Sequence, residues 1–194
     1  MSDIAYMYIP RISIPGFPVR GKKKYLNPQE LEKVLDGEIR IEEKLDGKLT
    51  RIYSDPLPVI SFAWFGEDLH YKHNIFYNKI PLSRTPFIIG IDVFSEAENK
   101  YVESRDSFFK IGDALPPFAT APVLLSGNNL KLSDILPLLE SKSAFGDEQI
   151  EGIVIKNYSS QIFGKIVNPK FDNDVDDSDH WLRKKRISNR INKE

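Results

Sequence analysis

One lysine of this sequence stands where a side-chain amine could do chemistry, at the start of the run Lys44-Leu45-Asp46-Gly47. Apolar and charged residues alternate over residues 39–42, which predicts a half-buried strand leading to the lysine. The Asp-Gly pair is typical of a turn, and residues 49–53 have the pattern of a second strand. The simplest structure for this pattern is an ordinary β-hairpin. The alternative is a nucleophilic lysine, which must be uncharged to attack and therefore needs a lowered pKa.

The rest of the chain supplies helices and strands that could position this lysine. Asn27 and Pro28 predict the start of a short helix that ends at residues 36–37. A second helix is expected over residues 130–141, with Ser133 as its candidate cap. Further strands are expected at residues 59–65, 86–94, 149–156 and 163–171, and a helical passage at 105–115. This mixture predicts an α+β domain.

Composition limits the classes of protein to consider. The 194 residues, 41% of them hydrophobic, can form the core of one domain, and 27 Lys and Arg against 28 Asp and Glu give no overall basic field. The absence of cysteine excludes disulfides, thiolate zinc sites and cysteine nucleophiles. Three scattered histidines suggest no histidine metal cluster, and His73 is expected to be structural. No signal peptide and no apolar run of ~20 residues is present, so no membrane contact and a cytoplasmic location are expected.

Both ends of the chain are charged. Prolines over residues 1–26 predict an extended strap, whose basic end at residues 20–24 could contact a phosphate or form a solvated loop. An acidic run and then a basic run fill residues 172–194, and such blocks are usually solvated or frayed.

Five segments occur in the order of motifs I, III, IIIa, IV and V of the covalent nucleotidyltransferases, the superfamily of DNA ligases, RNA ligases and messenger-RNA capping enzymes. These segments are residues 44–47, 65–67, 87–94, 151–156 and 165–167. The Glu-Lys-Leu-Asp-Gly form of the first motif, and the Lys-Ile-Val-Asn-Pro run from Lys165, resemble ATP-dependent RNA ligases most. The resemblance covers residues 8–171.

The resemblance implies a role for each cation of these motifs. Lys44 would be the nucleophile that attacks the α-phosphorus of ATP, forms a phosphoramidate with AMP and releases pyrophosphate. Lys165 would be the motif V lysine, which lowers the pKa of Lys44 and neutralises the α-phosphate together with a second cation. Many relatives carry that second cation where this chain has Val167, and Lys170 is the candidate replacement. Lys156 resembles the residue that contacts the adenine.

The acidic and aromatic candidates follow from the same resemblance. Glu151 of motif IV would bind Mg²⁺ (or Mn²⁺), and Glu67 of motif III would contact the ribose or a metal-bound water. Relatives often have Arg or Asn where this chain has Leu49, and an aromatic residue on the purine where it has Ile91. The residues that could act instead are Arg51 for the first position and Phe87 or Phe94 for the second, although surface charge and core packing explain them equally well. The remaining residues assigned to the nucleotide site are Glu42, Glu43 and Asp46.

We therefore expect residues 1–194 to form a single adenylyltransferase domain, with two antiparallel sheets flanking an ATP cleft, a motif-bearing core at 8–171, a charged tail at 172–194 and no OB-fold domain. The implied activity is that of an ATP-dependent polynucleotide ligase, an RNA ligase for RNA repair, which joins 3′-hydroxyl and 5′-phosphate ends of nucleic acid through lysyl-AMP. The alternatives are a capping-type guanylyltransferase or DNA ligase adenylation domain, and a non-catalytic nucleic-acid-binding module. The sequence does not give the natural substrate or the oligomeric state, for which a monomer is the default expectation.

Overall fold

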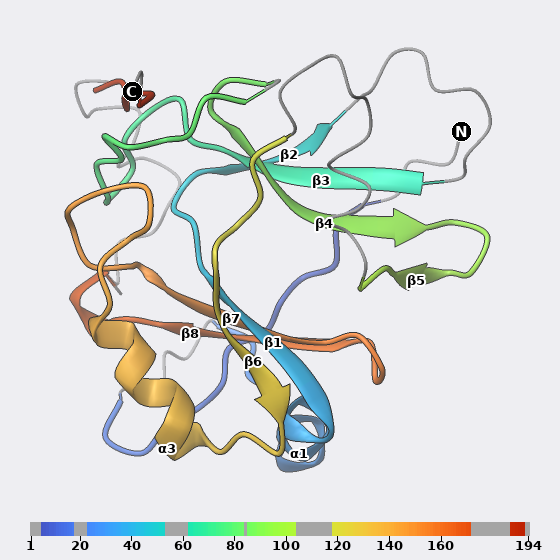
Figure 1. Cartoon of the computed structure of the whole chain (residues 1–194). Helices are drawn as coiled ribbons and strands as arrows, with labels where there is room; N and C mark the ends of the chain where they lie inside the picture. The colour runs from blue at the N-terminus through green and yellow to red at the C-terminus, as the bar shows by residue number, and fades with distance from the viewer. Residues whose placement is uncertain are drawn as a thin grey trace.

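The computed structural model describes residues 5–17, 23–52, 62–83, 85–103, 118–171 and 187–192. In these parts the chain forms two four-stranded sheets, and every strand pair is antiparallel. Figure 1 shows the two sheets as separate layers, with the first and last thirds of the chain mainly in the lower one. The expected pair of antiparallel sheets is confirmed.

We call the lower layer sheet A. Its strand order is β6 (Val123–Asn128), β1 (Glu38–Glu43), β7 (Gly152–Asn157) and β8 (Ile162–Val167). The expected strands at residues 149–156 and 163–171 correspond to β7 and β8, but the second of them ends at Val167. A 3₁₀ turn, η2 (Pro169–Phe171), follows it. Strand β6 was not expected from the sequence.

The upper layer is sheet B. Its strand order is β2 (Lys48–Ile52), β3 (Phe62–Asp68), β4 (Ile88–Ser95) and β5 (Lys100–Tyr101). The expected strand at residues 86–94 corresponds to β4. The expected strand at 59–65 corresponds to β3, but its first residues lie outside the described part of the chain, as does the helical passage expected at 105–115.

The expected β-hairpin around Lys44 is wrong. Strand β1 belongs to sheet A and β2 to sheet B, so residues 44–47 cross from one layer to the other. Local alternation reports which residues are buried but not which strand they pair with, and here β1 pairs with β6 and β7 instead of β2. A second crossing runs beside the first, where the Glu43 N–H donates to the Pro122 carbonyl at 2.9 Å.

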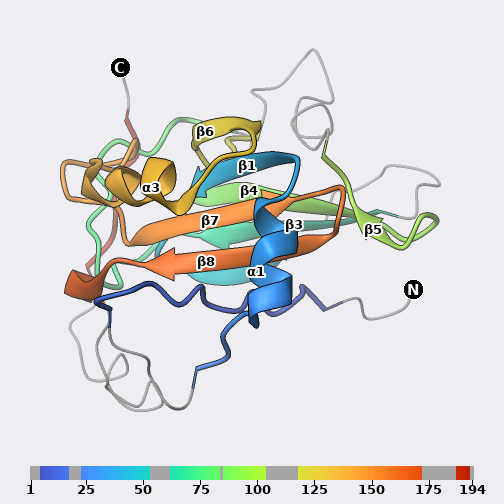
Figure 2. The ribbon, with the colours of Figure 1, turned by 90° about the horizontal axis from the view of Figure 1, so that it is seen from below.

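Two short helical segments cover sheet A. Helix α1 (Pro28–Leu35) has the expected cap, because the Asn27 side chain accepts from the Glu30 N–H and the Glu30 carboxylate accepts from the Asn27 N–H, each at 2.9 Å. Figure 2 shows α1 crossing over β7 and β8. Residues 132–140 form α3 (Leu132–Ile135) and then η1 (Leu136–Glu140). Ser133 lies inside α3 and does not cap it; the Asp134 carboxylate accepts from the Lys131 N–H instead, at 2.9 Å.

Apolar clusters fill the space beneath the helices and between the sheets. The largest joins α1, α3 and the outer face of sheet A through residues such as Val34, Ile41 and Ile155. Another contains Phe65 of β3 and Phe163 of β8, so it lies between the two layers. Among the described segments, no helix has the length and apolar character that a membrane span needs.

The N-terminal strap adds an irregular edge to sheet A. The Ile12 N–H donates to the Lys165 carbonyl at 2.8 Å, and the Lys165 N–H donates to the Pro10 carbonyl at 2.9 Å. On its other side, Arg11 exchanges backbone hydrogen bonds with residues 24–26. Figure 2 shows this segment running along β8. The expected extended strap is confirmed for residues 5–14, and residues 15–17 form a turn in which the Phe17 N–H donates to the Ile14 carbonyl at 3.1 Å.

The last described residues, 187–192, differ from the solvated or frayed tail expected of this region. They form backbone hydrogen bonds with residues 70–80, and Asn189 is only 3% exposed. The Asn189 amide donates to the Leu69 carbonyl at 2.7 Å and accepts from the Tyr77 N–H at 2.9 Å. This buried asparagine anchors the segment, because it satisfies backbone groups that have no regular sheet partner.

Candidate active site

Lys44 and Glu151 form the centre of the site. Lys44 lies in the crossing from sheet A to sheet B, and Glu151 immediately precedes β7. The Lys44 N–H donates to the Gly152 carbonyl at 2.9 Å, and the Lys44 Nζ is ion-paired with the Glu151 Oε2. The two residues are 107 positions apart in the chain, and their side chains are 22% and 10% exposed. The structure therefore brings Lys44 of motif I and Glu151 of motif IV into contact at a partly exposed site.

Two glycines allow this close approach of backbones. A side chain at Gly47 would collide with the Asp68 carbonyl and the Leu69 side chain. A side chain at Gly152 would collide with the Ile166 carbonyl. Since backbone atoms cannot move aside cheaply, only glycine fits at these positions.

The pKa of Lys44 is shifted in the direction opposite to the expected one. Burial by itself lowers the pKa of this amine. The charge and hydrogen bond of Glu151, and then the charges of Glu67 and Asp46, raise the pKa by more than burial lowers it, so the net shift is upward. The charge of Lys165 does not determine the direction of this shift, because the Glu151 carboxylate is in direct contact with Lys44. The ion pair with Glu151 favours the charged, ammonium form of Lys44.

The lowered pKa belongs to Lys165 instead. Burial, followed by the charges of Lys44 and Arg11, lowers the pKa of Lys165 to about 8. Its partner in β7 is Val154. The expected electrostatic coupling between the lysines of motifs I and V is therefore present, although Lys165 responds to it more than Lys44 does.

Glu67 lies on β3 at the other side of the crossing. Its Oε1 accepts from the Gly47 N–H at 3.1 Å. Burial raises the pKa of Glu67 to about 7, against the opposing effect of Lys44. Burial also raises the pKa of Glu151, which Lys44 partly offsets. The site thus concentrates negative charge at a place that a cationic ligand or a metal ion would neutralise.

A single carboxylate, Glu151, is the candidate for binding a metal ion. In the described segments, no group of three or more His, Cys, Asp or Glu side chains is arranged to hold one. Mg²⁺ at phosphate-transfer sites is commonly held by one or two carboxylates together with substrate phosphates and water. The donor set here fits a metal that arrives with a nucleotide, and it does not fit a resident structural metal.

Asp46 and Glu43 hold the backbone around Lys44. The Asp46 carboxylate accepts from the Asn74 N–H and from the Ile75 N–H, the latter at 2.8 Å, and the Asp46 N–H donates to the Tyr77 hydroxyl at 2.9 Å. Glu43 accepts from the Ser143 hydroxyl and from the Ala144 N–H. Both carboxylates are therefore satisfied by loops that pack on the crossing.

A buried polar network lies further along β1. The Lys156 Nζ contacts the Glu42 Oε2 and the Asp92 Oδ2, each at 2.8 Å, and donates to the Ile91 carbonyl at 2.8 Å. Asp92 also accepts from the hydroxyls of Tyr158 and Tyr6. Lys156 is 2% exposed, so the residue assigned to the adenine lies deep between the sheets.

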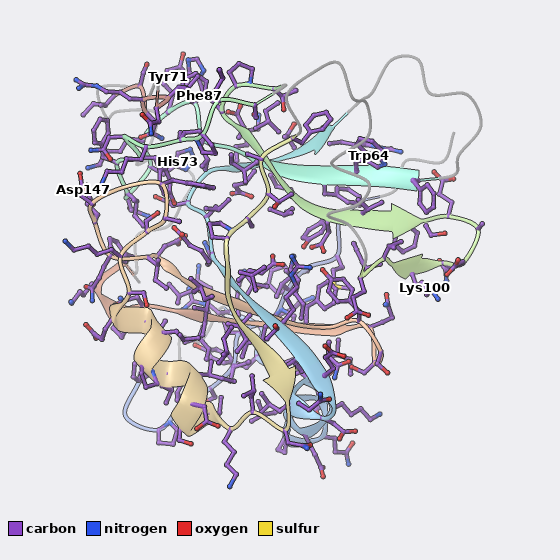
Figure 3. All side chains as sticks on the ribbon, in the orientation of Figure 1. Trp64, Tyr71, His73, Phe87, Lys100 and Asp147 are labelled. Atoms are coloured by element: carbon purple, nitrogen blue, oxygen red, sulfur yellow. The ribbon has the colours of Figure 1, made fainter. Side chains whose placement is uncertain are left out.

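The remaining candidates are placed less centrally. Phe87 has a left-handed backbone (φ 68°), and its ring contacts His70, which also contacts Tyr71. Figure 3 shows Phe87 and Tyr71 together among the loops, on the side of the molecule away from Lys100. Phe94 of β4 packs edge-to-face on Tyr101, in the apolar cluster that also contains Phe65 and Phe163.

Arg51 and Lys170 lie at two different edges of the site. Arg51 pairs with Phe65 in the β2–β3 register, which places it on the face of sheet B that is turned toward sheet A. The Lys170 Nζ donates to the Gln149 side chain at 2.5 Å on the surface. This contact holds the Lys170 ammonium group at the surface, whereas the Lys44 Nζ is paired with Glu151.

Sequence reasoning missed several residues that build the site. Tyr77 and Asn189 support the crossing from the loops, and Asp92 is the partner of Lys156. Tyr8 lies over the motif V lysine, with its ring centroid 5.2 Å from the Lys165 Nζ. An aspartate within the apolar run at residues 86–94 was the one local signal, since a carboxylate in a buried strand requires a partner.

Comparison with known proteins identifies the fold. No protein-family model matches the sequence, and no curated protein does. The solved structure of the Naegleria gruberi RNA ligase with PPi is similar, with a TM-score of 0.53 at 17% identity, over 74% of this chain and 53% of the ligase chain. A mutant of the same ligase with ATP and Mn has a TM-score of 0.52 at 15% identity, over 84% of this chain and 62% of the ligase chain.

The chain therefore shares its fold with these RNA ligase structures, in agreement with the fold that the sequence motifs implied. It spans a little over half of the length of the ligase chains that it resembles.

Proposed function

We propose that this protein is an ATP-dependent RNA ligase that works through a covalent lysyl-AMP intermediate on Lys44. The observation that supports this most directly is the contact between Lys44 and Glu151, with Lys165 close enough to be electrostatically coupled to both. A nucleophilic amine, a carboxylate for a divalent cation and a second cation are what transfer of a nucleotidyl group requires. The fold shared with an RNA ligase favours this use of the three groups.

The first step would be adenylylation of the lysine. The Lys44 Nζ attacks the α-phosphorus of ATP, a nitrogen–phosphorus bond forms, and the bond from that phosphorus to pyrophosphate breaks. The ammonium group gives up two protons, one before the attack and one as the phosphoramidate forms. Lys165 would stabilise the negative charge that grows on the α-phosphate.

Two further transfers would complete the reaction. An oxygen of a nucleic-acid 5′-phosphate attacks the same phosphorus, the nitrogen–phosphorus bond breaks, and Lys44 regains its protons. A 3′-hydroxyl then attacks the 5′-phosphate, loses its proton, and AMP leaves. We place this reaction in RNA repair in the cytoplasm, carried out by a monomeric adenylyltransferase domain.

A divalent cation, Mg²⁺ or Mn²⁺, would be held by Glu151. Bound there, it would neutralise Glu151 and the phosphates of ATP, and so remove the charge that raises the pKa of Lys44. The ATP and Mn in a similar ligase structure support this assignment. The finer assignments stay part of the proposal: Lys156 to the adenine, Glu67 to the ribose or a metal-bound water, Phe87 or Phe94 to the purine face, and Arg51 and Lys170 to phosphate.

Incubation with α-labelled ATP, followed by denaturing electrophoresis and mass spectrometry, tests the first step. We expect one adenylate on Lys44, none on the Lys44→Ala variant, and normal labelling of Lys48→Ala, which removes an exposed lysine four residues away. Since Lys44 is a partly exposed side chain in a crossing, Lys44→Ala should keep the fold, which circular dichroism can check. Labelling of Lys44→Ala to the wild-type level would contradict the assignment.

The same assay separates the alternatives. Labelling by GTP instead of ATP would indicate a capping-type guanylyltransferase, and labelling by neither would indicate a nucleic-acid-binding module. Sealing of nicks in RNA, DNA and hybrid duplexes then distinguishes RNA from DNA ligation. Glu151→Gln should lose labelling at any Mg²⁺ concentration that supports the wild type, and an unchanged Mg²⁺ response would count against the metal assignment.

A further inference from the structure

The edge that the N-terminal strap adds to sheet A carries a cluster of basic and aromatic side chains. Arg11 is the bridge partner of both Tyr25 and Lys165, in parallel registers, so the three side chains emerge on one face of this edge. The Lys24 Nζ and the Lys165 Nζ lie 5.5 Å and 5.2 Å from the centroid of the Tyr8 ring. We call Tyr8, Lys24 and Lys165 the strap patch.

The Tyr8 ring is an aromatic surface that the fold leaves open. Tyr8 is 54% exposed, although its neighbours Tyr6 and Ile9 pack into the cluster between the sheets. An exposed aromatic ring with cations beside it offers a stacking surface to a planar ligand. The lysines do not block such a ligand, because an exposed cation–π contact contributes only about 0.5–1 kcal/mol, and the exposed Lys24 can move off the ring.

The patch has the charge of a phosphate-binding surface. Burial, and then the charges of Lys44, Arg11 and Lys23, lower the pKa of Lys165, which agrees with the backbone bridge that places Arg11 beside Lys165. Lys24 and Lys165 both approach the Tyr8 ring, and neighbouring cations attract the phosphates of a polyanion. The overall charge of the protein is −1, so this attraction is local.

The patch is also continuous with the nucleophile. Lys165 belongs to both, since it contacts Tyr8 on one side and is electrostatically coupled to Lys44 on the other. A ligand on Tyr8 would therefore share Lys165 with the place where Lys44 would carry AMP.

We propose that the strap patch binds the terminal nucleotide of a single-stranded, 5′-phosphorylated nucleic acid, with the base stacked on Tyr8 and the terminal phosphate held by Lys24 and Lys165. The occupant is single-stranded because an unpaired terminal base can turn onto the Tyr8 ring, whereas a paired base is fixed by its partner and by the stack below it. This inference rests on the proposed function for the purpose of the site, but the binding itself needs neither ATP nor a reactive Lys44.

Fluorescence anisotropy with a short RNA labelled at its 3′ end, carrying a 5′-phosphate or a 5′-hydroxyl, tests the patch without ATP. Tyr8→Ala should weaken binding of the 5′-phosphorylated strand roughly 5- to 100-fold, the range expected for loss of one stacked base. Tyr8→Trp should restore it. Lys24→Ala should reduce the preference for the 5′-phosphate and lower the slope of log K against log salt by about one. The matched control is Tyr71→Ala, an exposed tyrosine at the opposite loops that should bind like the wild type.

Two further ligands in the same binding assay determine which kind of nucleic acid the strap patch prefers. A blunt duplex with the same 5′-phosphate should bind more weakly than the single strand, and a DNA strand of the same sequence shows whether the sugar contributes. Equal binding by Tyr8→Ala and wild type, failure of Tyr8→Trp to restore binding, or equal binding of duplex and single strand would each overturn the proposal.

The outcomes separate this inference from the proposed function. If the wild type takes no adenylate yet loses binding in Tyr8→Ala, the ligase proposal fails and the binding surface remains. If the wild type takes an adenylate and Tyr8→Ala binds and seals RNA normally, the ligase proposal remains and the strap patch fails.

Discussion

Lys156 and Asp92 lie in different sheets, and their charged groups are 2.8 Å apart, with side chains 2% and 0% exposed. Lys156 comes from β7 of sheet A and Asp92 from β4 of sheet B. Glu42 of β1 contacts the same ammonium group at 2.8 Å. The pair therefore links the two layers that the fold must hold on either side of Lys44.

Removing Lys156 takes from two buried carboxylates, Glu42 and Asp92, the cation that they share. We expect Lys156→Met to lower the free energy of unfolding by about 3–5 kcal/mol, as for other broken buried ion pairs. Lys100→Met, which removes a lysine that is 51% exposed and paired with Glu98, should change it by less than about 1 kcal/mol. Urea denaturation measures both, and equal effects of the two substitutions would show that the link between the sheets contributes little.

The low pKa of Lys165 should depend on Lys44. After burial, the charge of Lys44 is the largest cause of the shift to about 8, so Lys44→Met should move the pKa of Lys165 back toward 10.5. Lys23→Met should move it less, since Lys23 is the smallest of the causes. Titration of the lysine side chains by NMR gives these values directly. No upward shift in Lys44→Met would mean that the two lysines are not coupled.

Glu67 should make stability depend on pH. Its pKa in the folded protein is about 7, above its ordinary value of 4.5, so between these values the folded state keeps a proton that the unfolded state has lost. The contribution of Glu67 to stability is therefore greatest below pH 4.5, and it falls as the pH rises to 7.

Glu67→Gln removes this loss. The variant should gain roughly 2–3 kcal/mol relative to the wild type when the pH is raised from 4.5 to 8, because one pKa unit corresponds to about 1.4 kcal/mol. The control is Glu98→Gln, which removes the same charge from an exposed position. Denaturation at a series of pH values tests the prediction, and a constant difference for Glu67→Gln would refute it.

Asn189 should hold the loop that supports the Lys44 crossing. Asn189 bonds to the Tyr77 N–H and the Leu69 carbonyl, and the Tyr77 hydroxyl accepts from the Asp46 N–H. Asn189→Ala leaves the two backbone groups of this loop unsatisfied, which should cost about 1–3 kcal/mol. Hydrogen exchange should become faster at the amides of residues 75–77.

Arg190→Ala is the matched control for Asn189. It removes an exposed side chain that lies 5.8 Å from the Phe76 ring, and it keeps the backbone bonds of the segment. Its effect on exchange at residues 75–77 should be small. Similar protection in Asn189→Ala and wild type would mean that the C-terminal segment does not stabilise the loop.

Local patterns in the sequence determined much of the fold. The Asn27-Pro28 cap located α1, and alternation or continuous apolar character located β1, β2, β4, β7 and β8 to within a few residues. These features depend on residues close together in the chain. The Asn27 cap accepts from an N–H only three residues away, and the side chains of a strand alternate with a period of two. The order of the motifs also indicated the nucleotidyltransferase fold, because each motif is a short local run.

Only the tertiary structure decided how these pieces meet. It separated β1 and β2 into different sheets, placed Glu151 on Lys44 across 107 residues, and brought Asn189 under Tyr77 across 112. It also reversed the expected shift in the pKa of Lys44, since that shift depends on which charge lies in contact and not on which charges the motifs contain. Pairing and electrostatic coupling act through space, so a one-dimensional pattern identifies the participants but not their contacts.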